Sequence, residues 1–480
     1  MATPPDPALV ERLERFGQSG LLAHWDGLGP ADRATLVEEI ASIDLERLDR
    51  LIERFVKTKD AAEAGFDPAT VEPIEVARLP QTDGERSGRR LATDLGESVL
   101  AAGEVGVLIV AGGSGTRLGF EGPKGTYPIG AVSGSSLFQI HAEKIRALGR
   151  KYGRVVPLYI MTSPENHEAT VAFFESRDRF GLEHVRFFTQ GQMPAVDAKT
   201  GAVLLSAPSR VALAPDGHGG TFDALAAPAP GGGPSCLEEM RSLGLRTLFY
   251  FQVDNPLVKI ADPAFLGLHR SVDAEMSFKV IEKLAPDERV GVVVKAAGRP
   301  LVIEYSDLPP ALAERRGPGG ELELWAGSIA IHLLELDFID RIVSGSVELP
   351  FHKAVKKVPH FPKPGSAVFP LWPNAIKFER FIFDALPLAE RWAMMETDRA
   401  IEFEPLKNAE GPDSPASVRA RMTELFAGWL EAAGARIARD ETGNVPFPIE
   451  ISPLFAFSGS ELKGKVNGLE ITGPTYLAGE

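Results

Sequence analysis

Apolar residues recur at helical spacing in the N-terminal part of the chain. Leu9, Leu13 and Phe16 follow one another at spacings of four and three residues, which places them on one face of a helix. The same spacing returns several times between residues 30 and 55. No cluster of catalytic side chains accompanies it. The pattern predicts a helical N-terminal domain over residues 1–95 that serves packing or oligomerisation.

From about residue 96 the pattern changes to short runs that are apolar on both faces, separated by helical stretches. The runs are 105–111, 155–161, 247–253 and 290–294, and the helical stretches between them include 136–148 and 166–174. Runs of this kind are typical of buried strands in parallel sheets. We therefore expect an α/β domain over residues 96–390. It should contain a mainly parallel mixed sheet flanked by helices, with ligands at the carboxyl ends of the strands.

The alternation stops near residue 390. Val418, Met422 and Phe426 share one helical face in the stretch 417–433, as their spacing of four requires. The tail that follows has short β-like runs separated by Gly and Pro, which is typical of strands joined by tight turns. We expect a small α+β C-terminal domain over residues 391–480.

Composition narrows the class of protein. A chain of 480 residues exceeds the roughly 100–200 residues usual for one domain. Lys and Arg number 51 against 66 Asp and Glu, a net charge of −15, and a field of that sign disfavours nucleic-acid binding. An anionic ligand must therefore meet a locally positive pocket.

Cysteine content and the apolar runs bear on the compartment. The one cysteine, Cys236, cannot form an internal disulfide, which favours the cytoplasm, and without a histidine close in sequence it is expected to be inert. The longest apolar run, Val105–Ala111, is far shorter than the roughly 20 residues of a membrane helix. The N-terminus lacks the basic-then-apolar pattern of a signal peptide. We expect no membrane association.

The strongest local signal is a glycine-rich turn in residues 107–130, VLIVAGGSGTRLGFEGPKGTYPIG. A predicted buried strand runs into this turn, where missing side chains allow backbone N–H groups to approach a phosphate. The residues expected to do so are Gly112, Gly113, Gly115 and Thr116. Two cations, Arg117 and Lys124, follow. The turn predicts binding of a nucleoside triphosphate.

Two better-known phosphate motifs do not fit this turn. The dinucleotide pattern G-x-G-x-x-G fails because Leu118 stands where the third glycine belongs. The P-loop pattern requires Gly-Lys-Ser/Thr in succession, whereas Lys124 lies between Pro123 and Gly125. A nicotinamide dehydrogenase is therefore disfavoured.

The turn resembles the signature of the UDP-sugar pyrophosphorylases, most of all the eukaryotic-type UDP-N-acetylglucosamine pyrophosphorylases. The resemblance continues through ordered blocks as far as residue 415. They are FTQGQMPAVD (188–197), APDGHGGTFDAL (214–225), FQVDNPLVKIADP (251–263), RVGVVV (289–294), VIEYSDL (302–308), AGSIAIH (326–332), IKFERFIFDALP (376–387) and FEPLKNAEGPDSP (403–415). It implies a Rossmann-like nucleotidyltransferase core.

The resemblance also implies a reaction. UTP and a sugar 1-phosphate would give a UDP-sugar and pyrophosphate, with Mg²⁺ as cofactor. The attacking phosphate oxygen is already ionised, so no protein base is required and catalysis rests on positioning and charge neutralisation. By resemblance, Arg117, Lys124 and Lys407 are the catalytic cations, with Lys407 reaching the phosphates from the C-terminal domain.

Further residues take binding roles by resemblance. Gln190 and Gly217 would contact the uracil and ribose. Asp254 follows a predicted strand directly, which suits a Mg²⁺ ligand or a ribose partner. The residues that match the sugar pocket are His218, Gly291, Glu304, Ser328, Lys377, Phe381 and Phe383. From residue type alone, the two phenylalanines could equally belong to the core.

Two departures from the resembled family concern the sugar. His218 stands where the N-acetylglucosamine enzymes typically have Asn, and Ser328 stands where they also typically have Asn. Loss of two amides removes groups that can hold an acetamido substituent. The expected substrate is N-acetylglucosamine 1-phosphate. Glucose 1-phosphate or several sugar phosphates are the alternative, and a non-catalytic UDP-sugar-binding protein is the second alternative.

Overall fold

The computed structural model describes residues 4–58, 66–345, 349–362 and 366–479. Their contacts divide the chain into two compact units. The first unit comprises the described residues of 1–65, 190–221 and 347–385, and the second comprises those of 66–189, 222–346 and 386–480. These units cut across the three ranges expected from the sequence, and that three-part division stays a prediction.

The second unit is a mixed α/β structure built on one large sheet. Within its described residues the sheet has ten strands, and seven of them follow the order β1-β12-β14-β10-β2-β3-β4. β11 pairs with β14 and β17, and β13 pairs with β12. The strands are β1 (Val71–Pro73), β2 (Val105–Val110), β3 (Leu158–Thr162), β4 (Val185–Thr189), β10 (Thr247–Gln252), β11 (Met276–Glu282), β12 (Val292–Ala296), β13 (Arg299–Ile303), β14 (Ala326–Glu335) and β17 (Trp392–Glu396).

The parallel part of the sheet contains the strands with the strongest apolar runs. β10, β2, β3 and β4 lie side by side and are parallel, and β2 and β10 are buried along almost their whole length. The runs predicted at 105–111, 155–161 and 247–253 are therefore confirmed as strands. Their carboxyl ends lie on one edge of the sheet, where Ala111 and Val253 continue the chain.

The strand expected at 290–294 pairs differently. It is present as β12, but it is antiparallel to β1, β13 and β14. β12 and β13 are joined by Ala297 and Gly298, whose φ angles are +46° and +77°. Two positive φ angles in succession are typical of a tight hairpin, which forces neighbouring strands to be antiparallel. The sheet is therefore mixed.

Helices of the second unit surround this sheet. They are α4 (Asp83–Ala102), α5 (Leu137–Tyr152), α6 (His167–Glu175), α7 (Thr221–Ala226, with its first residue in the first unit), α8 (Cys236–Ser242), α9 (Pro263–Ser271), α10 (Pro310–Ala313), α11 (Leu336–Ser344), α12 (Arg399–Glu402) and α13 (Pro415–Ala432). Two short parallel pairs follow α13, namely β18 (Arg436–Ile437) with β20 (Glu470–Ile471) and β19 (Ile449–Ile451) with β21 (Thr475–Leu477). Among the described helices, none is long and apolar enough to cross a membrane.

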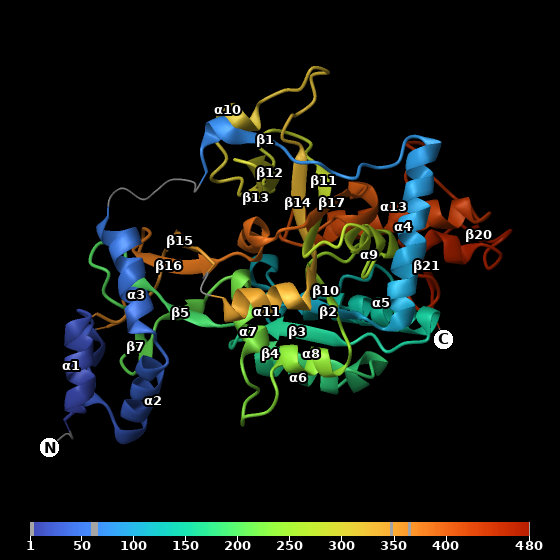
Figure 1. The fold of residues 1–480 in the computed structure, drawn as a ribbon. Coiled ribbons are helices and arrows are strands. Elements are labelled where there is room, and N and C mark those ends of the chain that lie inside the picture. The colour runs from blue at the N-terminus through green and yellow to red at the C-terminus, as the bar shows by residue number, and fades with distance from the viewer. Residues whose placement is uncertain (1–3, 59–65, 346–348, 363–365, 480) are drawn as a thin grey trace. The chain divides into compact units, whose positions relative to one another are not determined.

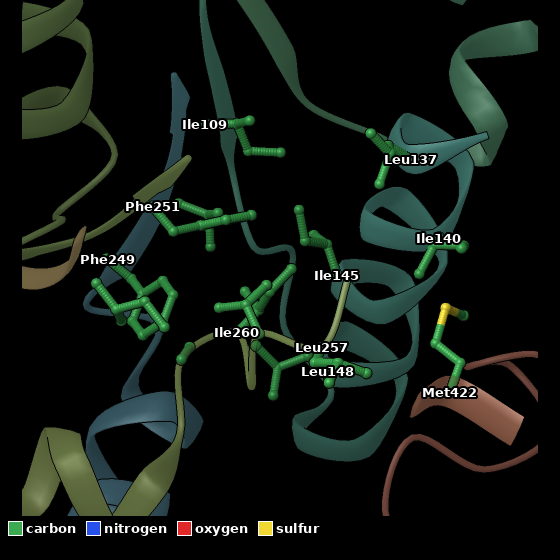
Figure 2. Packing of buried hydrophobic residues seen from close by; sticks show 14 of the residues in the cluster. Ile109, Leu137, Ile140, Ile145, Leu148, Phe249, Phe251, Leu257, Ile260 and Met422 are labelled. Carbon is green, nitrogen blue, oxygen red and sulfur yellow. The ribbon is translucent and has the colours of Figure 1, made fainter. Parts of the chain in front are cut away.

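The core of the second unit joins the sheet to the C-terminal helix. Ile109 and Phe251 from the sheet face Ile145 of α5, and Met422 of α13 lies in the same cluster (Figure 2). Burial of such side chains stabilises a protein by roughly 1.5–3 kcal/mol each. Since α13 shares this core, the segment that carries Lys407 belongs to the same compact unit as the glycine-rich turn.

The first unit combines helices with short strands. Its elements are α1 (Pro7–Arg15), α2 (Pro30–Ala41), α3 (Leu45–Ile52), β5 (Gln192–Pro194), β6 (Val196–Asp197), β7 (Leu205–Ala207), β8 (Arg210–Val211), β9 (Leu213–Pro215), β15 (Phe351–Lys356) and β16 (Ala375–Arg380). Figure 1 shows α1, α2 and α3 beside one another. Their buried residues Leu13, Leu36 and Leu48 share a cluster with Val196 and Phe378 of the strands. The N-terminal helices therefore complete the core beneath β6 and β16.

Candidate active site

The glycine-rich turn forms a closed loop at the end of β2. The Gly115 N–H donates to the Gly122 carbonyl at 2.9 Å, and the Lys124 N–H donates to the Gly113 carbonyl at 3.0 Å. A Cβ atom on Gly115 would lie 2.7 Å from a ring carbon of Phe120, so only glycine fits there. The loop thus folds back on itself and brings Lys124 beside the glycines.

The surface of this loop is accessible to a ligand. Gly113, Thr116 and Arg117 are exposed, and Gly112 is half-buried. Arg117 lies on a 3₁₀ turn, Thr116–Leu118. Backbone N–H groups on such a loop, with a cation beside them, suit the oxygens of a phosphate chain.

A buried asparagine that the sequence did not single out braces the loop. Asn166 donates from Nδ2 to the Ala111 carbonyl at 2.9 Å and to the Gly113 carbonyl at 3.3 Å. Its Oδ1 accepts the Ser163 N–H at 3.0 Å. Asn166 comes directly before α6, a position where asparagine is common. The sequence around it therefore gives no sign that it braces the loop.

Lys124 and Asp254 form an ion pair in the centre of the site. Lys124 Nζ lies 3.1 Å from Asp254 Oδ2, and the exposed fractions of the two side chains are 18% and 11%. Asp254 follows β10, so it stands at the carboxyl edge of the sheet beside the loop that follows β2. The contact places a predicted phosphate-binding cation beside the predicted Mg²⁺ ligand; the roles of both residues stay predictions.

Lys407 is tied to the same place through its backbone. The Leu406 N–H donates to the Asp254 carbonyl at 2.8 Å, and Lys407 is the next residue. Its ammonium group lies 5.9 Å from the centre of the Phe403 ring. Lys407 therefore belongs to the same compact unit as Lys124 and Asp254; that its side chain reaches the phosphates from a separate C-terminal domain stays a prediction.

Three of the predicted sugar-binding residues also meet in the second unit. The Ser328 N–H of β14 donates to the Gly291 carbonyl at 2.8 Å. The Glu304 carboxylate lies over Gly291, because a Cβ atom on that glycine would be 3.0 Å from Glu304 Oε1. The backbone of Ser328 and the Glu304 carboxylate thus lie beside a residue without a side chain, and a carboxylate there suits contact with sugar hydroxyls.

The remaining sugar-binding candidates belong to the first unit. His218 packs against two aromatic rings, with centroids 5.3 Å from Phe381 and 5.7 Å from Phe383. His218 Nδ1 accepts the Ile382 N–H at 3.1 Å. Burial lowers the pKa of His218 to about 4, so the ring is neutral near pH 7 and, with Nδ1 accepting, carries its proton on Nε2. Lys377 is half-buried on β16.

The turn before His218 is held by a buried ion pair that sequence reasoning missed. Arg380 Nη2 lies 2.6 Å from Asp216 Oδ2, and each side chain is 6% exposed. Gly217 has a φ angle of +83°, and a Cβ atom there would lie 2.3 Å from the Arg380 carbonyl oxygen. Gly217 is therefore required both for the backbone turn and for the close approach of Arg380. Gln190 is buried at the start of this segment of the first unit.

The candidate residues thus form two groups. One, in the second unit, contains the glycine-rich loop with Arg117, Lys124, Asp254, Lys407, Gly291, Glu304 and Ser328. The other, in the first unit, contains Gln190, Gly217, His218, Lys377, Phe381 and Phe383. The first group contains three cationic side chains and the backbone of the glycine-rich loop, which suit a phosphate chain. The second offers aromatic surface and a neutral histidine.

The carboxylates of the site can be compared with the ligands that the expected Mg²⁺ ion needs. Among the described residues, no group of three or more His, Cys, Asp or Glu side chains could hold a metal ion. Mg²⁺ does not require one, because it usually takes one or two carboxylates and completes its shell with substrate phosphates and water. Asp254, the carboxylate beside the phosphate loop, fits that role.

Comparison with known proteins decides the family. A family model described as UTP–glucose-1-phosphate uridylyltransferase matches residues 47–410, a range that includes every candidate residue from Gly112 to Lys407. The chain belongs to this uridylyltransferase family. The match covers parts of both units, so the two groups of candidate residues lie within one family signature.

Individual relatives are similar over almost the whole chain. UDP-N-acetylglucosamine diphosphorylase 1 of Arabidopsis thaliana is 36% identical over 500 residues, covering 100% of this chain and 94% of the relative. UDP-N-acetylglucosamine pyrophosphorylase of Saccharomyces cerevisiae is 35% identical, covering 94% and 96%. UDP-N-acetylhexosamine pyrophosphorylase-like protein 1 of Homo sapiens is 37% identical, covering 97% and 96%.

Solved structures agree with the fold. The uridine diphosphate N-acetylglucosamine pyrophosphorylase of Trypanosoma brucei has a TM-score of 0.79 at 30% identity, covering 95% of this chain and 94% of that one. A UDP-glucose pyrophosphorylase variant of Leishmania major has a TM-score of 0.60 at 16% identity, covering 94% and 95%. The second likeness concerns the fold alone. The fold is thus that of sugar nucleotidyltransferases, as expected.

Proposed function

We propose that this protein transfers the uridylyl group of UTP to N-acetylglucosamine 1-phosphate, forming UDP-N-acetylglucosamine and releasing pyrophosphate. The observation that carries the proposal is the ion pair of Lys124 with Asp254 beside a closed glycine-rich loop, with Lys407 directly after Leu406, whose N–H bonds the Asp254 carbonyl. The relatives at 35–37% identity carry N-acetylglucosamine or N-acetylhexosamine names. The UDP-glucose enzymes are much more distant, at 16% identity.

The reaction needs positioning and positive charge. An ionised oxygen of the sugar phosphate attacks the α-phosphorus of UTP, the bond from that phosphorus to the β-phosphate oxygen breaks, and its electron pair leaves with pyrophosphate. Arg117, Lys124 and Lys407 stabilise the negative charge that builds on the phosphoryl oxygens and the leaving group. Asp254 holds the Lys124 ammonium group in place before the nucleotide arrives.

Asp254 would also hold Mg²⁺ together with the phosphate oxygens of UTP. When bound, the ion supplies positive charge to the triphosphate and to the departing pyrophosphate. Lys124 is then expected to turn from Asp254 toward the phosphates, because their negative charge attracts its ammonium group.

The binding roles follow from the two groups of residues. Gly112, Gly113 and Thr116 would receive the phosphates, and Gln190 and Gly217 the uracil and ribose. Gly115, expected among the phosphate contacts, is buried and uses its N–H to close the loop onto the Gly122 carbonyl. Glu304 would accept hydrogen bonds from sugar hydroxyls, with Gly291 and Ser328 beside it. Lys377, Phe381 and Phe383 would contact the sugar as well.

His218 bears on the choice of sugar. Its Nδ1 is already used by the Ile382 N–H, so Nε2–H is the remaining polar group of the ring. A fixed N–H donor can bind the carbonyl oxygen of an acetamido group. The same N–H can equally donate to the oxygen of a sugar hydroxyl. Glucose 1-phosphate or a broad range of sugar phosphates therefore remains the second candidate substrate.

Cytoplasmic location belongs to the same proposal. The one cysteine of the sequence, Cys236, is buried and free, and burial raises the pKa of its thiol to about 11. Such a thiol is unreactive. A free, unreactive cysteine is what we expect of a protein in a reducing compartment.

The test is turnover with a panel of sugar 1-phosphates. Pyrophosphate release is measured with UTP, Mg²⁺ and either N-acetylglucosamine 1-phosphate or glucose 1-phosphate at matched concentrations. We expect a higher kcat/KM for the acetylated sugar. A higher value for glucose 1-phosphate would move the chain to the second candidate, and tight UDP-sugar binding without turnover would support a non-catalytic role.

A further inference from the structure

A buried side chain beside Asp254 holds the segment that carries Lys407. Asn255 is 5% exposed and uses both ends of its amide. Nδ2 donates to the Glu402 carbonyl at 2.8 Å, and Oδ1 accepts the Glu404 N–H at 3.3 Å. Oδ1 also accepts the Leu257 N–H at 3.2 Å, so the side chain joins its own loop to residues 402–404.

These bonds continue into the backbone with a regular spacing. Glu402 and Glu404 are bound by the Asn255 amide, and Leu406 is bound by the Asp254 carbonyl. Alternate residues of 402–406 are therefore fixed to Asp254 and Asn255, much as one strand is fixed to its neighbour. Lys407 is the first residue beyond this ladder.

The two ends of the segment are fixed as well. Before it, the Glu402 side chain is fully buried and accepts hydrogen bonds from Lys279 Nζ at 2.6 and 2.8 Å. After it, the Lys407 N–H donates to the Asp413 carbonyl at 2.7 Å. Asp413 has a φ angle of +58°, a left-handed conformation that costs energy for a residue other than glycine. The backbone at Lys407 is thus held on both sides.

We propose that Asn255 is a positioning residue of the uridylyl transfer, which sets the place of Lys407 relative to Lys124 and Asp254. The inference rests on the proposed function, since it assigns Lys407 a place in that reaction. Asn255 does not act on the substrate. It removes the freedom of the 402–406 segment, so that the Lys407 ammonium group meets the phosphates without first ordering its own backbone.

Asparagine suits this position for a chemical reason. The amide must donate to a carbonyl and accept from N–H groups at the same time, which neither an apolar side chain nor a carboxylate can do. Asn255→Ala removes all three bonds and leaves buried backbone groups without partners. Asn255→Asp keeps the shape and the acceptor but loses the donor to Glu402.

The first experiment is a double-mutant cycle between Asn255 and Lys407. We expect Asn255→Ala to lower kcat at least tenfold while the KM for UTP changes less than threefold. In the Lys407→Ala background the same change should lower kcat less than twofold further, because the group that Asn255 positions is already missing. If the two losses instead multiply, Asn255 does not act through Lys407 and the proposal is wrong.

A second experiment does not depend on activity. Hydrogen exchange of a peptide covering residues 403–409 is compared between the wild-type protein and Asn255→Ala, which removes the side-chain acceptor of the Glu404 N–H. We expect at least tenfold faster exchange of this peptide, because the Glu404 N–H loses its partner and the segment is no longer held at Glu402. Unchanged exchange overturns the proposal. If the wild-type protein has no transferase activity, the proposed function fails, while this experiment still decides whether Asn255 holds the segment.

A matched variant separates positioning from general stability. Asn374, in the first unit, also binds backbone with both ends of its amide, since Oδ1 accepts the Val358 N–H at 2.8 Å and Nδ2 donates to the Val358 carbonyl at 3.0 Å. Asn374→Ala is expected to lower the unfolding temperature by about as much as Asn255→Ala and to leave kcat within twofold of wild type. An equal loss of kcat in both variants would contradict the positioning role.

Discussion

Removal of the buried ammonium group of Lys279 should destabilise the second unit strongly. Lys279 lies on β11 with a side chain that is 0% exposed, and its Nζ is 2.7 Å from Asp262 Oδ2 and 2.6 Å from Glu402 Oε1. Burial disfavours the charged amine, but the two carboxylates outweigh it and raise the pKa of Lys279. Lys279→Met leaves both carboxylates without their cation, so we expect a loss of about 3–5 kcal/mol.

Urea unfolding at pH 7.5 measures this loss. A second measurement at pH 5.5 adds a signature, because protonation of the stranded carboxylates relieves their repulsion and the difference between variant and wild type should shrink. The double variant Lys279→Met/Glu402→Gln should recover part of the stability, since it removes one of the two stranded charges. A loss below about 1 kcal/mol, or the same loss at both pH values, would refute the reasoning.

Three other predictions follow from single contacts. Lys124→Ala should lower kcat at least a hundredfold in the pyrophosphate assay, with the unfolding temperature nearly unchanged; normal turnover would remove Lys124 from the mechanism. Gly217→Ala should cost roughly 2–4 kcal/mol in urea unfolding, because its Cβ meets the Arg380 carbonyl at 2.3 Å; a neutral effect would exclude this packing. Burial lowers the pKa of His141 to about 3 and of His218 to about 4, so the unfolded chain takes up protons first as the pH falls below about 6.5. For each ring the free energy of unfolding should then fall by about 1.4 kcal/mol per pH unit, down to the pKa of the folded state. A free energy of unfolding in urea that stays constant between pH 6.5 and 5 would contradict this prediction.

Features set by local sequence could be predicted. β2 and β10 have apolar residues on both faces and the phosphate loop has its glycines close together, so the pattern of neighbouring residues specifies them. Asp254 lies just after a predicted strand, so its place at the carboxyl edge of the sheet followed from the sequence. Its ion pair with Lys124, 130 residues away, was not predicted, because Lys124 reaches that edge only through the fold of the loop.

Contacts without a local signature could not be predicted. Asn255 and Glu402 are 147 residues apart, and Asp216 and Arg380 are 164 apart. Nothing in the neighbouring sequence distinguishes these buried polar residues from exposed ones. The division into two units could not be predicted for the same reason, because the first unit is assembled from three separate stretches of chain. The antiparallel pairing of β12 with β13 does have a local origin, because Ala297 and Gly298 form a tight turn with positive φ angles.

The path of the α-phosphate tests the central claim most directly. UTP labelled with ³²P at the α-position and, separately, at the γ-position is incubated with N-acetylglucosamine 1-phosphate, Mg²⁺ and the protein, and the products are separated. Attack at the α-phosphorus predicts α-label in UDP-N-acetylglucosamine and γ-label in pyrophosphate, with both signals greatly reduced in Lys124→Ala. Transfer of γ-label to the sugar, or no transfer of either label, would contradict the assignment of this site to uridylyl transfer.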